Sequence, residues 1–235
     1  QTIFVLTLSN IMKTFVYGDS FNNANFCKCS HDQMWYAPLV QGELIDRTRE
    51  GASTEEMFLL ATNDAVNHSG ARFVLATGVL YSRLMLYTDQ LYDKEQVHEG
   101  TLADCMPYFS TQELEKTLHT GIFHHTLVWA KYLSHIVTLH SLMQTQSHQW
   151  FVVHMHTDRH EHQSPGNPLV LPLLKHSATM PNYMDHRHSC MNVCKDAGIR
   201  PWDYNQYSWS GHHSIEGQQH FGAYAHRIFQ DRGLS

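Results

Sequence analysis

The sequence lacks a basic run, a long apolar run and a regular set of cysteines, and each absence argues against a class of protein. Lys and Arg number 16 against 22 Asp and Glu, and the net charge of −6 disfavours nucleic acid as a partner. No apolar stretch approaches the ~20 residues of a membrane-spanning helix, so we expect no membrane partner. Five cysteines, an odd number, do not suggest a disulfide framework, and a reducing, cytoplasmic setting is the default expectation.

What is present predicts a globular chain. With 42% hydrophobic residues over 235 positions, the chain can bury a sizeable core, and we find no repeat or linker that divides it. We therefore predict a single domain over residues 1–235. Residues 1–11 are uncharged and apolar, and we interpret them as a non-native or upstream extension ahead of Met12, although a clipped signal peptide or a leading strand would read similarly.

Hydrophobic patterning predicts alternating strands and helices. Strands are expected at 14–17, 44–45, 71–78 and 150–156, and helices at 34–40, 54–65, 112–143, 189–197 and 214–229. Ser53 and Glu56 would form a capping box at the start of the second helix. Residues 81–110 read as irregular, 157–167 as a polar loop, and the proline-rich stretch to 181 as loop. Connections too long for hairpins favour an α/β fold with a parallel sheet covered on both faces.

The predicted first strand is followed by Gly18-Asp19-Ser20, which contains the first candidate catalytic residue. A serine at the carboxyl end of a parallel strand lies on the edge where open α/β sheets bind their ligands. Taken alone, Gly-Asp-Ser also fits an ordinary turn. Near the other end of the chain, His213 stands just before a predicted helix. Imidazole is the usual base that activates a serine hydroxyl, although a single histidine is more often structural.

Together the two ends resemble a known family. Residues 17–20 (Tyr-Gly-Asp-Ser) and 213–217 (His-Ser-Ile-Glu-Gly) look like the first and last blocks of the SGNH (GDSL-type) hydrolases. Gly51 matches the second block, and Thr77-Gly78 matches the start of the third. The resemblance implies a three-layer αβα fold with a flavodoxin-like parallel sheet of about five strands. It also implies ester hydrolysis through a serine acyl-enzyme, with no cofactor.

The resemblance assigns roles to individual residues. Ser20 would be the nucleophile and one oxyanion-hole donor, Gly51 a second donor through its N–H, and His213 the general base. Two positions depart from the family: Leu80 replaces an asparagine that donates to the oxyanion, and Ser210 replaces the acid three residues before the histidine. Asn63 is set aside as a substitute donor because it lies within a helical pattern. Six residues are candidates for a supporting role: Asp19, Gly78, Arg83 as a compensating charge, Asp203 as a displaced acid, Ser210 and His212.

Other clusters compete for function. A zinc site would draw on Cys27, Cys29 and His31 with the 186–194 segment, but neither group has Cys-x-x-Cys spacing, and we expect no metal. One of histidines 154, 156, 160 and 162 could line the site, but surface positions are the favoured interpretation. The rings of Trp35, Trp202 and Trp209 could be aromatic platforms for a sugar, but core packing is favoured for each. The sequence therefore predicts a hydrolase of a small ester or of an O-acyl group on a carbohydrate. The alternatives are a weakened, non-catalytic binding module on the same fold and, third, a zinc-binding protein.

Overall fold

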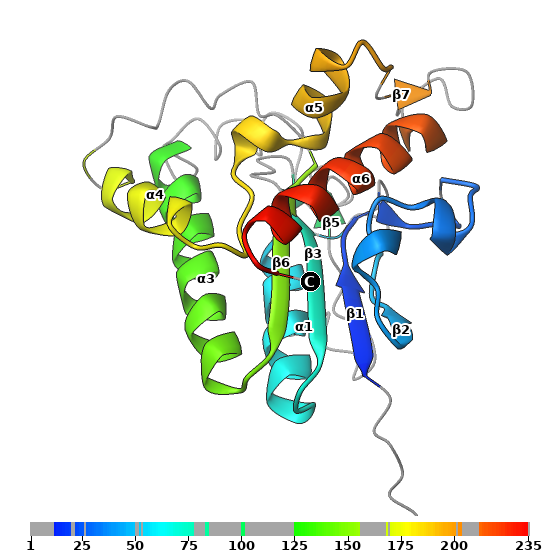
Figure 1. The fold of residues 1–235 in the computed structure, drawn as a ribbon. Helices are drawn as coiled ribbons and strands as arrows, with labels where there is room; N and C mark the ends of the chain where they lie inside the picture. The colour runs from blue at the N-terminus through cyan, green and yellow to red at the C-terminus, as the bar shows by residue number, and fades with distance from the viewer. Residues whose placement is uncertain are drawn as a thin grey trace, which may run out of the picture.

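A four-stranded parallel sheet lies at the centre of the described chain (Figure 1). In the computed structural model its order is β2-β1-β3-β6, with bounds β1 Lys13–Tyr17, β2 Glu43–Asp46, β3 Arg72–Thr77 and β6 Gln149–His154. The structure describes residues 12–19, 22–25, 27–49, 52, 54–77, 83–84, 100–101, 125–155, 168, 170–200, 202–203 and 212–234. The strand order is that of flavodoxin-like doubly wound sheets.

Side chains of β1, β3 and β6 alternate between two cores. Phe15 and Tyr17 of β1 join one apolar cluster, whereas Val16 between them joins the other. The same alternation runs through β3 and β6, because successive side chains of a strand point to opposite faces. Both faces are buried, which explains why these strands are continuous apolar runs in the sequence.

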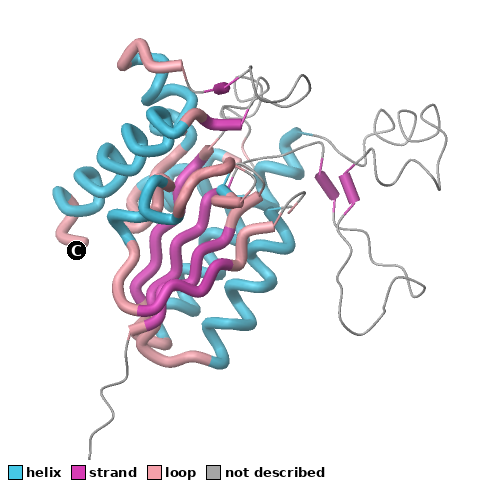
Figure 2. The backbone as a smooth tube through the Cα atoms, turned by 90° about the vertical axis from the view of Figure 1, so that its right-hand side faces the viewer, coloured by secondary structure: helices cyan, strands magenta, loops and turns pink. Residues whose placement is uncertain are grey.

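Helices cover both faces, which gives three layers (Figure 2). On one face lie α1 Thr54–Asn67 and α3 His125–Thr145, with α4 Leu171–Ala178 packed against α3. On the other lie the short turns η2 His31–Gln33 and η3 Ala37–Leu39, then α5 Cys190–Asp196 and α6 Ile215–Asp231. No helix in the part of the chain that the structure describes is long and apolar enough to cross a membrane.

Smaller elements complete the described chain. The strands β4 Arg83–Leu84 and β5 Gly100–Thr101 pair antiparallel, as do β7 Trp202–Asp203 and β8 His212–His213. The turn η6 His186–His188 leads into α5. Outside β6, Tyr183 forms a parallel bridge with Val152, at the position of a fifth strand. The predicted α/β class and three-layer arrangement are confirmed, with four strands and this bridge for the expected five.

Two local predictions are wrong. Residues 34–40 form no α-helix: the segment contains only η3, with Pro38 in its first turn, although it is docked on the sheet as expected. The proline-rich stretch to 181 contains α4, and Pro172 lies in the first turn of that helix, where its missing N–H costs no hydrogen bond. Residues 1–11, most of 81–124, and 156–167 lie outside the described residues.

Candidate active site

Parallel strands end at one edge of the sheet, and the predicted nucleophile follows the first of them. β1 ends at Tyr17, and Gly18 and Asp19 begin a tight turn; Ser20 itself lies outside the described residues. Asp19 is buried, its carbonyl accepts from the N–H of Asn22 at 2.9 Å, and its carboxylate accepts from the Asn22 amide at 2.8 Å. A Cβ on Gly18 would lie 2.4 Å from Cβ of Asn22, so the close packing of Asn22 requires glycine there.

The loop that carries Gly51 is bonded to this turn. The N–H of Arg49 donates to the carbonyl of Gly18 at 2.9 Å, and the N–H of Ala52 donates to the carbonyl of Arg49 at 3.2 Å. Arg49 also forms a 2.5 Å ion pair with Glu56 in the first turn of α1. Gly51 and Ser53 lie outside the described residues, so the capping box stays a prediction. The residues on either side of Gly51 are nevertheless held to the turn before Ser20, because Ala52 is hydrogen-bonded to Arg49 and Arg49 to Gly18.

A chain of buried side chains joins the same turn to α6. The amide oxygen of Asn22 accepts from the indole N–H of Trp35 at 2.8 Å, and the backbone N–H of Trp35 donates to Oε1 of Gln218 at 3.2 Å. Helix α6 passes so close to Trp35 that a Cβ on Gly222 would lie 2.4 Å from the Trp35 carbonyl oxygen. We call the series Asp19–Asn22–Trp35–Gln218 the relay. It holds the Ser20 turn and the first turns of α6 in one packed unit.

Helix α6 begins directly after the predicted base. Ser214 caps it: its hydroxyl accepts from the N–H of Gly217 at 3.0 Å and donates to the carbonyl of Arg200 at 2.9 Å. The preceding strand β8 contains His212 and His213. In the β7–β8 pair, His213 is opposite Trp202 and His212 is opposite Asp203. The chain therefore folds back at Asp203, as a displaced acid would require, but the residue opposite it is His212.

The structure describes only some of the remaining predicted residues. Gly78, Leu80 and Ser210 lie outside the described residues, and of Arg83 only the backbone, in β4, is described. Asn63 lies in the middle of α1, which agrees with setting it aside. Trp35 is fully buried, which confirms its interpretation as a core residue.

A second polar group lies at this edge, around a histidine for which the sequence favoured a surface position over a place in the site. His154 ends β6 and is buried, not a surface residue as predicted. Its Nε2 lies 2.8 Å from the Tyr132 hydroxyl and 2.9 Å from the Tyr183 hydroxyl, and Tyr132 in turn meets the hydroxyl of Thr77 at 2.8 Å. Burial raises the pKa of Tyr132, so the phenol stays protonated. The only signal for this cluster was the position of Thr77 and His154 at strand ends.

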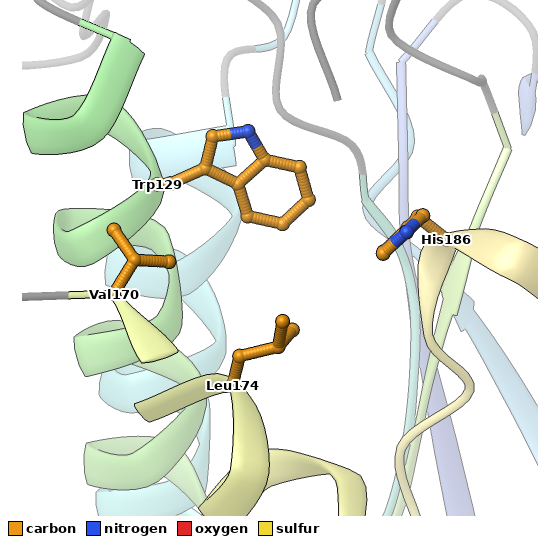
Figure 3. A pocket seen from close by; sticks show the side chains of 4 residues that line it. All are labelled: Trp129, Val170, Leu174 and His186. Atoms are coloured by element: carbon orange, nitrogen blue, oxygen red, sulfur yellow. The ribbon is translucent and has the colours of Figure 1, made fainter. Parts of the chain in front are cut away.

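A small cavity lies beside this cluster (Figure 3). Trp129 of α3, Val170, Leu174 of α4 and His186 of η6 line it, and its volume of about 10 Å³ admits at most about one water molecule. The indole of Trp129 stacks near His154, with ring centroids 6.5 Å apart. The cavity is apolar and adds no nucleophile to the site.

The cysteines and histidines of the candidate zinc site do not form a metal-binding group in the part of the chain that the structure describes. Within that part, no three His, Cys, Asp or Glu side chains gather closely enough to hold an ion. The histidines of the two predicted clusters make other contacts: Nδ1 of His31 lies 2.7 Å from the Tyr36 hydroxyl, and Nδ1 of His188 lies 2.6 Å from that of Tyr224.

Comparison with known proteins gives similarity at the level of structure alone. No protein-family model and no curated protein matches the sequence. Among solved structures, the chain is similar to a member of the lipolytic G-D-S-L family from Veillonella parvula DSM 2008, at 13% identity and a TM-score of 0.41, over 94% of this chain and 96% of that one. It is also similar to a lipolytic-type protein of the G-D-S-L family from Desulfitobacterium hafniense DCB-2, at 12% identity and a TM-score of 0.41, over 92% and 99%.

These two structures belong to the family whose motifs the sequence resembles. At TM-scores of 0.41 the overlays carry no weight for the chemistry of this chain. The α/β fold rests instead on the order and parallel pairing of its own strands.

Proposed function

We propose that the protein is a serine hydrolase that cleaves a small ester, such as an O-acyl group on a carbohydrate, through an acyl-enzyme on Ser20. One observation carries the proposal: the turn that precedes Ser20 is bonded on one side to the loop of Gly51 and on the other to the helix that follows His213. Three segments far apart in the sequence are thus joined at the ligand-binding edge of the sheet.

In this mechanism His213 takes the proton of the Ser20 hydroxyl, and the serine oxygen attacks the ester carbonyl. The N–H groups of Ser20 and Gly51 stabilise the oxyanion, and the alcohol leaves with the proton returned by His213. Water then repeats the sequence on the acyl-enzyme. Leu80 cannot supply a further oxyanion donor, a loss of roughly 100- to 1,000-fold in rate. We therefore expect a slow enzyme.

The test is a panel of p-nitrophenyl esters of increasing acyl length, with purified wild type beside Ser20→Ala. Wild type is expected to turn over at least the short esters, and Ser20→Ala to be inactive with an almost unchanged Tm. Ser134→Ala, which alters an exposed serine of α3, is the matched control and should behave as wild type. Equal turnover in Ser20→Ala and wild type would overturn the proposal.

Labelling by a fluorophosphonate distinguishes the hydrolase from a non-catalytic binding module. The reagent phosphonylates only a serine that a base activates, so incorporation is expected in wild type and not in Ser20→Ala. A chain that neither turns over esters nor incorporates the reagent would contradict the hydrolase and leave the non-catalytic alternatives.

A further inference from the structure

Three sulfur atoms gather on the loop between β1 and η2. The side chains of Cys27 and Cys29 are neighbours across one turn, and Sγ of Cys29 lies 3.1 Å from Sδ of Met34. Both cysteines are half-buried at the rim of the core, whereas Met34 is buried beneath them. A solute can therefore reach the thiols, while the thioether is held in place by packing.

The backbone of the loop brings the two cysteines together. The N–H of Cys29 donates to the carbonyl of Ala24 at 3.1 Å, and that of Lys28 donates to the carbonyl of Asn25 at 3.3 Å. These two bonds are those of a Schellman motif, which turns the chain through a left-handed residue. Here that residue is Lys28, with φ of 51°, where glycine is usual. The turn is what places the thiol of Cys29 within reach of both Cys27 and Met34.

Two thiols and a thioether are soft ligands. Such sulfur sets select Cu(I), whereas a structural zinc site takes four nitrogen, thiolate or carboxylate ligands. We propose that Cys27, Cys29 and Met34 bind one Cu(I) ion through two thiolates and one thioether. Binding displaces two thiol protons. The site thus gains the single positive charge of Cu(I) and loses two protons, so its net charge falls by one. Neither the Cys-x-x-Cys spacing nor a fourth ligand is needed for a three-coordinate site.

The chain contains a second cysteine pair that serves as a control. Sγ of Cys190 and Sγ of Cys194 lie 4.0 Å apart, one turn from each other in α5. Both are fully buried under α6, so an ion cannot approach them without opening the core. Each pair thus offers two thiols. Cys190 and Cys194 are fully buried, whereas Cys27 and Cys29 are half-buried and Cys29 contacts the thioether of Met34.

The experiment titrates the full, reduced chain with Cu(I) anaerobically against a chromophoric Cu(I) chelator. We expect one ion per chain, held by sulfur alone in X-ray absorption. Cys27→Ser with Cys29→Ser should weaken binding by more than about 100-fold, beyond the range for loss of a supporting residue. Met34→Leu, which conserves volume, should weaken it about 10- to 100-fold. Cys190→Ser with Cys194→Ser should bind as wild type does.

Circular dichroism of each apo variant checks that it is folded, and Cys27→Ser alone, at a half-exposed position, replaces the double variant if that one fails to fold. Equal affinity in wild type and in the Cys27 variants would overturn the proposal, and so would loss of binding in the Cys190 and Cys194 variant. A nitrogen or oxygen ligand in the absorption spectrum, or an unchanged spectrum in Met34→Leu, would overturn the proposed site of two thiolates and one thioether.

Discussion

The two faces of the sheet are packed in different ways. On the α1/α3 face, aromatic rings stack across strands, with Phe15 and Phe73 centroids 5.3 Å apart. Its polar groups include an ion pair between Arg47 and Asp64 with a hydrogen bond from Tyr17 to Asp64, and the separate cluster around His154. On the α6 face, the relay runs through the core from Asp19 to Gln218. Its donors and acceptors are neutral apart from Asp19, and they span residues far apart in the sequence.

This difference separates stability from function. The contacts of the α1/α3 face hold the strands to their covering helices and add burial, which is the main source of folding free energy. Those of the α6 face join the turn of Ser20 to the helix after His213. We therefore expect damage to the first face to lower Tm and leave turnover, and damage to the second to lower turnover beyond its effect on Tm.

The largest expected effect is at the predicted base. His213→Ala should lower kcat/KM by about 10,000-fold, because without an imidazole the serine hydroxyl is not activated. His212→Ala is the matched control and should cost far less, since adjacent residues cannot both reach one point. Ester turnover of the two variants decides the register. Greater damage from His212→Ala would mean that His212 is the base.

The relay should be next in size. Gln218→Leu removes the acceptor of the buried Trp35 N–H, so the free energy of unfolding should fall by about 1–3 kcal/mol. A shift of α6 by about 1 Å would lower turnover by up to about 100-fold. Urea unfolding and ester turnover measure the two effects.

The matched change on the other face is Tyr17→Phe, which removes only the hydroxyl that donates to Asp64. It should cost about 1 kcal/mol of stability and leave turnover within about twofold of wild type. If Tyr17→Phe lowers turnover as much as Gln218→Leu does, the two faces do not differ in function.

Restoring the missing acid should have a smaller effect, and it should raise turnover rather than lower it. Ser210→Asp should raise turnover by about 10-fold, because a carboxylate there would orient the imidazole of His213, although in imperfect geometry. Asp203→Asn should leave turnover unchanged if no acid acts in wild type. Collapse of Asp203→Asn without a gain in Ser210→Asp would instead identify Asp203 as the relocated acid.

The smallest effect is a pH dependence of stability from the α1/α3 face. Burial lowers the pKa of His135 and of His140, both on α3. Their folded pKa values lie below the unfolded value of about 6.5, so the unfolded chain binds protons first on acidification. Their contribution is complete above about pH 6.5 and is lost as the pH falls toward the folded values.

Thermal unfolding at about pH 7.5 and pH 5.5, either side of the ordinary histidine pKa, checks this. Tm of wild type should fall more on acidification than Tm of the variant with His135→Gln and His140→Gln. An identical fall in both would show that these two histidines do not contribute.

Much of the fold could be predicted because its signals are local. The apolar runs of β1, β3 and β6 are buried on both faces, and α5 and α6 begin directly after Ser189 and Ser214, the first residues of the helices predicted at 189–197 and 214–229. The helix α4 was missed because prolines argue for loop unless one falls in the first turn. Ile215, the first residue of α6, is 40% exposed, whereas the apolar side chains Phe221, Ala225 and Phe229 further along the helix are buried.

Only the site residues that belong to recognisable sequence motifs could be predicted. Ser20, Gly51 and His213 carry a recognisable pattern, whereas Asn22 and Gln218 carry none. The hydrogen bond between Trp35 and Gln218 spans 183 positions, and such pairing depends on how the layers pack. His154 was misjudged for a related reason: the tyrosines that bind it come from α3 and from the bridge beside β6.

The central claim is that a base activates Ser20 at this edge of the sheet. Treating wild type with a fluorophosphonate, digesting it and sequencing the modified peptide by mass spectrometry tests that claim most directly. The account predicts a single adduct on Ser20, formed in wild type and lost in His213→Ala. An adduct on another residue, or equal labelling of Ser20 in His213→Ala, would contradict it.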